Sequence, residues 1–152
     1  MNLIHKIKQL NLNEFLRFEE LNYIDFFASH PFLIFEPGQK EYLDLRYYGF
    51  TNISLEYINS KHIFSNQREK LKTVFTYLIS KDLIIPKIEK KVINYHLTKL
   101  GNSIVTKFTS EYYEGYKVSA QYILNILKKL SQSKKEECIE IWLNNSSKFA
   151  II

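Results

Sequence analysis

Two short β-prone stretches joined by a charged turn lie near the middle of this chain, and they limit its possible folds more than any other part of the sequence. The first reads Leu-Ile-Ile-Pro over residues 83–86, the second reads Val-Ile-Asn-Tyr-His-Leu over residues 92–97, and three lysines and a glutamate lie between them. Apolar and β-branched runs separated by a short polar segment favour a hairpin. We therefore predict one antiparallel β-hairpin here.

Helical patterns flank this hairpin. Before it, apolar residues recur every three or four positions from Leu71 to Ile79, and Ser65 is a suitable N-cap. After it, Thr98 can cap a helix whose apolar positions continue to Phe108. A helix, a charged hairpin and a second helix follow one another, and the motif Leu-Thr-x-x-Gly ends the second strand of the hairpin. This order is typical of a winged helix, although any helix–hairpin–helix unit would show it. We predict a winged-helix-like core over residues 65–108.

The rest of the chain is mostly of helical character. Only four glycines and three prolines occur among 152 residues, which is low for a globular protein. Apolar spacing predicts an N-terminal helix over 13–31 and C-terminal helices over 110–147. Residues 32–64 have no sustained period, so short strands, a helix with an irregular entry and an extended arm all fit them. The predicted fold is mainly α with a small β-hairpin, in a single domain over 1–152.

Side chains that could carry catalysis are scattered. The single cysteine and four histidines form no cluster with metal-ligand spacing, and the glycines are too isolated for a phosphate-binding loop. Asp25 and His30 could come within reach of each other, either as an acid–base pair or, more simply, as a helix-capping contact. We predict no catalytic residue, no metal and no cofactor. A small enzyme is kept as a third class of function.

The sequence also indicates where the protein is located. The longest uncharged stretches are too short to span a bilayer, and no secretory signal is evident. One cysteine allows no intramolecular disulfide, which agrees with a reducing compartment. We therefore expect a cytoplasmic protein that makes no membrane contact.

Positive charge is concentrated in residues 61–107, which contain ten basic and three acidic side chains. Winged helices bind DNA through the helix before the wing and through wing residues that contact phosphate. The candidate phosphate contacts are Arg68, Lys70, Lys72, Lys87, Lys90 and Lys91. Because nearly all are lysines, binding without sequence specificity is the stronger form of this hypothesis. A solvated lysine-rich face explains the same residues.

Aromatic residues gather in two parts of the chain. Tyrosine is enriched at interface hot spots because it combines a large ring with a polar end. The candidate partner interface comprises Tyr47, Tyr48, Phe50, Tyr57, Tyr112, Tyr113 and Tyr116. Taken one at a time, each of these rings is better explained as a core residue.

The order of these features resembles the middle components of bacterial ABC-three-component systems, including the small subunit of Lamassu-type anti-phage defence. The resemblance lies in Leu21 to His30, the helix from Arg68 to Ile84, and Val92 to Tyr112 with its Tyr-x-Leu-Thr-x-x-Gly and Phe-x-Ser-x-Tyr pieces. It implies a non-catalytic adapter that joins an ATPase of the SMC or Rad50 kind to an effector, often a nuclease. It also allows non-specific DNA contact through the complex.

A stand-alone winged-helix transcriptional regulator is the alternative. The positive charge around the hairpin motivates it, and it would require a symmetric dimer with sequence-selective DNA binding. An adapter would instead purify together with the other subunits of its complex.

Overall fold

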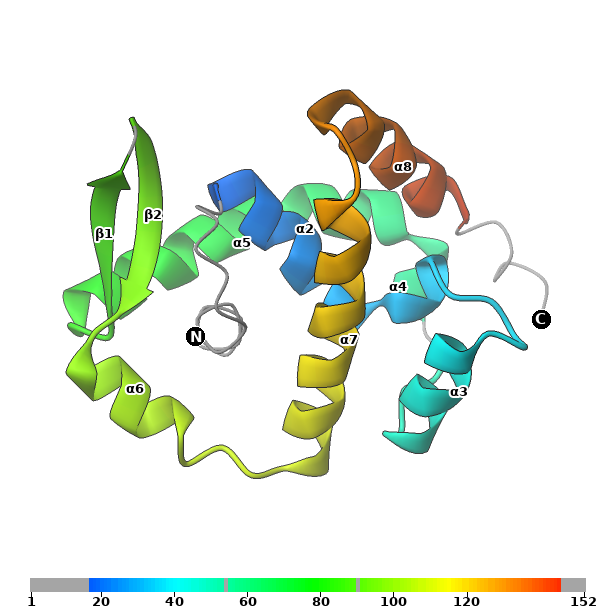
Figure 1. The fold of residues 1–152 in the computed structure, drawn as a ribbon, viewed down its shortest axis with the longest axis horizontal. Coiled ribbons are helices and arrows are strands. Elements are labelled where there is room, and N and C mark those ends of the chain that lie inside the picture. Colours follow the sequence, from blue (N-terminus) through cyan, green and yellow to red (C-terminus); the bar gives the residue numbers. More distant parts are fainter. Residues whose placement is uncertain (1–16, 54, 90, 146–152) are drawn as a thin grey trace.

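A computed structural model describes residues 17–53, 55–89 and 91–145. This part of the chain is mainly helical with a two-stranded antiparallel hairpin, which confirms the predicted fold class (Figure 1). The elements in chain order are α2 (Phe18–Ser29), η1 (Pro31–Leu33), α3 (Lys40–Tyr47), α4 (Leu55–Ile58), α5 (Ser60–Ser80), β1 (Ile84–Glu89), β2 (Val92–Leu97), α6 (Lys99–Val105), α7 (Glu111–Lys128) and α8 (Gln132–Asn144).

Helix α2 forms the centre of the core, packed against α5 and α7 (Figure 1). Ile24, Phe26 and Phe27 on α2 are fully buried. The helix ends at Ser29, and Pro31 opens the short helix η1, consistent with the fixed φ and missing N–H of proline. The predicted N-terminal helix is confirmed over 18–29, and its residues 13–16 lie outside the described residues.

Helices occupy the part of the chain that had no clear period. Residues 40–47 form α3 and residues 55–58 form α4, so the strand and extended-arm alternatives are wrong there. A C-terminal cap ends α3: Gly49 adopts φ +85°, its N–H donates to Arg46 O, and the Phe50 N–H donates to Leu45 O. This Schellman-type cap turns the Phe50 ring into the core.

Helix α5 begins at Ser60, five residues before the predicted start. The Ser65 hydroxyl donates to Lys61 O inside the helix, so it is not an N-cap, whereas the Ser60 hydroxyl donates to Leu143 O of α8. The apolar stripe is also narrower than predicted, because Val74 and Ile79 are exposed. A contact to α8 far along the chain, rather than a local cap, decides where this helix starts.

The hairpin and the turn after it confirm the prediction. Strands β1 and β2 pair from Ile84↔Leu97 to Glu89↔Val92, and Tyr95 packs edge-on against Phe75 of α5 at 4.6 Å between ring centroids. The order helix, hairpin, helix is therefore as predicted. Its assignment to the winged-helix fold remains a prediction.

Thr98 joins the hairpin to α6. Its hydroxyl oxygen accepts a hydrogen bond from the Gly101 N–H at 3.0 Å and donates to Asp82 O at 2.6 Å. The predicted N-cap is thus confirmed, and the same side chain holds the chain between α5 and β1 against the start of α6. At the C-terminal end, α7 and α8 confirm the predicted helices over 110–145, and residues 146–147 lie outside the described residues.

Candidate partner-binding surfaces

Two of the predicted phosphate contacts already have acidic partners. Arg68 Nη2 lies 2.9 Å from Glu19 Oε1, and Lys72 Nζ lies 2.7 Å from Glu69 Oε1. The hydrogen bond from Arg68 lowers the pKa of Glu19 below its usual range. A phosphate would have to compete with these carboxylates, so Arg68 and Lys72 are poor candidates for DNA binding.

Three lysines remain as candidate phosphate contacts. Lys70 on α5, Lys87 on β1 and Lys91 at the hairpin turn are exposed, and none forms an ion pair with a described residue. Lys90 lies outside the described residues. We name Lys70, Lys87 and Lys91 the free-lysine set.

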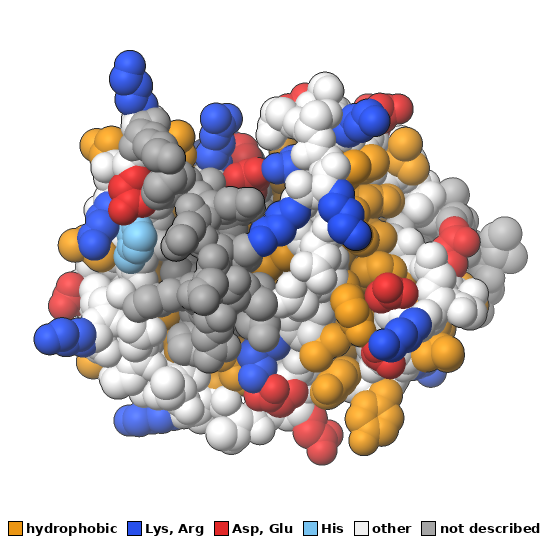
Figure 2. Space-filling view, in the orientation of Figure 1, with side chains coloured by type: hydrophobic (Ala, Val, Ile, Leu, Met, Phe, Trp, Pro, Cys, Tyr) orange, Lys and Arg blue, Asp and Glu red, His pale blue; other side chains and the backbone are white. Residues whose placement is uncertain are grey.

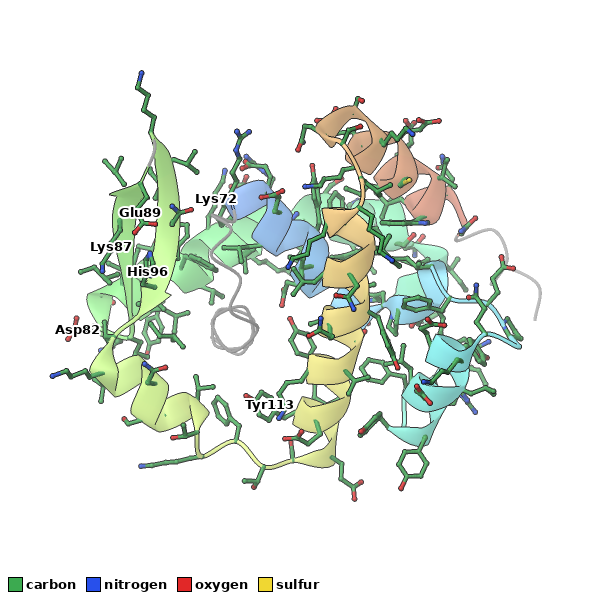
Figure 3. The ribbon with its side chains drawn as sticks, in the orientation of Figure 1. Lys72, Asp82, Lys87, Glu89, His96 and Tyr113 are labelled. Carbon is green, nitrogen blue, oxygen red and sulfur yellow. The ribbon has the colours of Figure 1, made fainter. Side chains whose placement is uncertain are left out.

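Acidic and neutral polar groups share the hairpin with Lys87. Figure 3 shows Lys87, Glu89 and His96 on the hairpin, and the strand register places Lys87 and Glu89 on the same face because they are two residues apart. His96 Nε2 lies 3.7 Å from Glu89 Oε1, and Asn94 Nδ2 donates to Glu89 Oε2 at 3.3 Å. This face is therefore less positive than the lysine count alone indicates.

The seven predicted interface rings do not form one surface. Tyr47 and Tyr112 are 87% and 62% exposed, and Tyr48 is partly exposed. The other four rings are buried in the core: Phe50, Tyr57, Tyr113 and Tyr116. The burial of these four agrees with the core interpretation of each ring, and a partner could not reach them without opening the core.

Packing explains why these rings are inside. Tyr57 lies against His30 and Phe32, with ring centroids 5.6 Å and 6.3 Å away. Tyr113 and Tyr116 lie on the same side of α7 as Ala120 and Ile123, the buried stripe of that helix. The sequence alone does not separate the exposed from the buried tyrosines, because their burial depends on contacts with residues far along the chain.

The exposed rings lie at the junction of α3 and α7. We define the aromatic surface as Leu43, Tyr47, Tyr48 and Tyr112. Tyr47 contacts Tyr48 edge-on at 5.7 Å, and Tyr112 stacks at 6.0 Å on the buried Phe50 ring. Figure 2 shows hydrophobic side chains gathered over α7 and α3.

Gly115 permits this arrangement. A Cβ at this position would lie 2.7 Å from Tyr48 Cβ, which is closer than real side chains approach. The absence of a side chain at Gly115 therefore allows α3 to pack directly on α7.

Carboxylates border the aromatic surface. Glu41 and Asp44 belong to α3, and Glu111 and Glu114 lie in the first turn of α7. Lys87 and Lys91 are far from the aromatic surface, because the hairpin and α3 are on opposite sides of the molecule in Figure 1. The molecule thus has a positive hairpin side and an acidic, aromatic α3 side.

A family model for the Middle Component 2 of ABC-three-component (ABC-3C) systems matches residues 56–149. The chain belongs to this family. The match begins within α4 and includes α5, the hairpin and α6 to α8, so α2 and α3 precede the matched segment. No curated protein matches this chain. No solved structure matches it either. The protein is thus a middle component of an anti-phage ABC-3C system.

A partly buried polar centre joins three helices of this middle component. Asp25 Oδ1 accepts a hydrogen bond from the Tyr116 hydroxyl at 2.5 Å, and Asp25 Oδ2 accepts one from Gln67 Nε2 at 2.8 Å. Asp25 thus links α2 to α7 and to α5. Local sequence patterns do not reveal this centre, because Tyr116 and Gln67 are 91 and 42 residues from Asp25.

Asp25 and His30 do not form a pair. His30 Nδ1 lies 2.9 Å from Phe26 O, and His30 Nε2 lies 3.1 Å from Glu56 Oε2. Residues five apart on an α-helix point in directions about 140° apart, so the two side chains serve different neighbours. The acid–base interpretation of this pair is wrong.

The described part of the middle component contains neither a cluster of metal ligands nor a membrane-spanning helix. Among residues 17–53, 55–89 and 91–145, no three His, Cys, Asp or Glu side chains gather closely enough to hold a metal ion. No helix in these ranges combines the length and the apolar character needed to cross a bilayer.

Alkaline pH should destabilise this middle component through its hydrogen-bonded tyrosines. The Tyr122 hydroxyl donates to Asp44 Oδ2 at 2.6 Å, and this hydrogen bond raises the pKa of Tyr122 to about 12. Burial raises the pKa of Tyr116 well above its usual value. The fold favours the protonated phenols. For Tyr122 the stabilising contribution is complete below pH ~10 and is lost as the pH rises toward about 12, and the raised pKa of Tyr116 acts in the same direction.

Urea unfolding at a series of alkaline pH values measures this effect. We expect the free energy of unfolding to fall above pH ~10, and Tyr122→Phe to make that fall shallower. A native Tyr122 that ionises at the pH of free tyrosine, followed by phenolate absorbance, would contradict the assignment.

Proposed function

We propose that this middle component is a non-catalytic adapter that joins an SMC- or Rad50-like ATPase to an effector nuclease, in a cytoplasmic anti-phage complex of the Lamassu type. Membership in the Middle Component 2 family is the observation that carries this proposal. In it, the chain contributes binding surfaces, and its partners contribute the chemistry.

The distribution of charge supports an adapter. Lys87 and Lys91 of the free-lysine set lie on the hairpin, and the aromatic surface lies on the α3 side, across the core formed by α2, α5 and α7 (Figure 1). Two partners that bind at separate places do not compete, and opposite charge at the two sides makes them chemically distinguishable. In this proposal one partner contacts the hairpin side and the other contacts the aromatic surface.

Affinity purification of the tagged chain from its native operon, followed by mass spectrometry, tests the proposal. We expect a coiled-coil ATPase and an effector to purify with it at fixed stoichiometry. Tyr47→Ala should reduce recovery of one partner, and Lys87→Glu should reduce recovery of the other. Glu140→Ala, an exposed change on α8, should leave both unchanged. Recovery of the chain alone would refute the adapter role.

A DNA contact is the second candidate function, and the unpaired state of the free-lysine set favours it. We propose that Lys70, Lys87 and Lys91 contact phosphate without reading sequence, either within the complex or in a winged-helix regulator. Each phosphate contact contributes about 0.9 to the slope of log K against log salt for duplex DNA. Replacing all three lysines by glutamine should therefore flatten the salt dependence of binding. Sequence-selective binding by a symmetric dimer would favour the regulator.

A further inference from the structure

The aromatic surface exposes rings that a folded chain usually covers. Tyr47 and Tyr112 present their rings to solvent, and Leu43 beside them is 60% exposed. The Phe50 ring beneath Tyr112 is fixed in the core, so Tyr112 rests on a rigid base. Rigid exposed aromatic rings lose little conformational entropy on binding, which suits them to a partner contact.

The two segments that contain these rings carry more acidic than basic side chains. Residues 36–58 and 108–116 contain six carboxylates and two cationic side chains, Lys40 and Arg46. Arg46 Nη1 donates to Phe50 O at 3.2 Å, so its guanidinium is directed to the backbone. Glu41 and Glu111 form no ion pair with a described residue. A negative field around exposed rings attracts cations and repels acidic partners.

The chain itself contains an example of the chemistry that such a surface offers. On α7, Lys117 Nζ lies 4.7 Å from the centre of the Tyr113 ring and 2.5 Å from Glu114 Oε1. A ring and a carboxylate next to each other in the chain thus hold one ammonium group between them. Both contributions, cation–π and ionic, favour the same ligand.

Glu111 and Tyr112, two residues earlier, form a second ring–carboxylate pair on the same helix. The positions that would supply an intrahelical cation to this pair, three and four residues further on, are Glu114, Gly115 and Tyr116. None of these is basic. The pair is therefore exposed, acidic and without the lysine that its neighbour has.

We infer that the aromatic surface binds a basic segment of a partner protein, rich in arginine or lysine, whose cations lie on Tyr47 and Tyr112 and pair with Glu41 and Glu111. This inference rests on the proposed adapter function and deepens it by stating the chemistry of one partner. Helix α3 precedes the segment that matches the family model, so three of the four residues of this surface are outside the family match.

Charge reversal within the complex is the first test. The double variant Glu41→Lys/Glu111→Lys should reduce recovery of one partner about tenfold and leave the other partner in place. The matched control is Glu137→Lys/Glu140→Lys on α8, which makes the same change in net charge at exposed positions. Recovery of both partners at wild-type levels with the first variant would overturn the inference.

Peptide binding by the isolated full chain separates this inference from the adapter proposal. Fluorescence anisotropy should detect salt-sensitive binding of a short oligo-arginine peptide and none of an oligo-glutamate peptide. Binding should weaken about tenfold in Tyr47→Ala/Tyr112→Ala and in the Glu41/Glu111 variant, and should be retained by the α8 control. Equal binding by all variants would overturn the inference, even if the purification recovers both partners.

A second copy of this chain is the alternative ligand of the aromatic surface. The free-lysine set of a second copy is also basic and could occupy the aromatic surface. Sedimentation of the purified wild-type chain should give a monomer. An oligomer that dissociates in the Glu41→Lys/Glu111→Lys variant would show that a second copy, and not a different partner, binds there.

Discussion

Replacing Gly101 with alanine should destabilise the chain by about 2 kcal/mol, near the middle of the range for overpacking a tight contact. A Cβ at this position would lie 2.1 Å from the carbonyl oxygen of Leu83. That oxygen belongs to the backbone and already accepts from the Thr98 N–H at 3.1 Å, so it cannot move without loosening the hairpin. Alanine favours a helix by about 1 kcal/mol over glycine, and the clash must exceed this gain.

Urea unfolding of Gly101→Ala measures the loss. Ser103→Ala is the matched control, because Ser103 is exposed on the same helix and its hydroxyl donates only to Leu100 O. We expect the control to stay within about 0.5 kcal/mol of the wild type. Equal stability of the two variants would show that the start of α6 can shift to accommodate a Cβ at position 101 and that Gly101 is not a packing constraint.

Replacing Asp25 with alanine should cost about 2–3 kcal/mol of stability. The variant leaves the Tyr116 hydroxyl, which is buried, and the Gln67 amide without their acceptor. Hydrogen bonds to a charged acceptor are among the stronger ones, and an unpaired buried hydroxyl adds its own desolvation cost. Chemical unfolding monitored by circular dichroism gives the difference.

A double-mutant cycle with Tyr116→Phe isolates the interaction. We expect Asp25→Ala to cost about 1 kcal/mol less when Tyr116 is already phenylalanine, because no hydroxyl is then left unpaired. Strict additivity of the two changes would mean that the hydrogen bond makes no net contribution. In that case the position of Asp25 between three helices would need another explanation.

Local patterns predicted the hairpin, the Thr98 cap and the C-terminal helices. The cap and the helices depend on residues within four positions of one another, and the hairpin pairs residues at most 13 positions apart, so short stretches of sequence contain the relevant contacts. The start of α5 was predicted wrongly because Ser65 satisfies the local rule for an N-cap, whereas contact between Ser60 and α8 extends the helix by five residues. Residues 40–58 were ambiguous for a related reason: each helix there is short, and one depends on its cap at Gly49.

The candidate surfaces could be predicted only in outline. The tyrosines and lysines were identifiable by type, but their burial and ion pairs depend on partners far along the chain. Arg68 pairs with Glu19 across 49 residues, and Tyr122 pairs with Asp44 across 78. Helix periodicity indicates which side of a helix is apolar, but it does not indicate which neighbouring helix covers that side.

The sequence by itself therefore determined the kinds of element, the caps at local turns, the absence of a recognisable catalytic motif and the resemblance to middle components. Only the tertiary structure decided that four of the seven candidate interface rings are core residues, that Asp25 joins three helices, and that Tyr47 and Tyr112 remain exposed. The physical reason is distance along the chain. Backbone propensities and caps act over a few residues, whereas burial and charge pairing are set by how helices pack after the chain has folded.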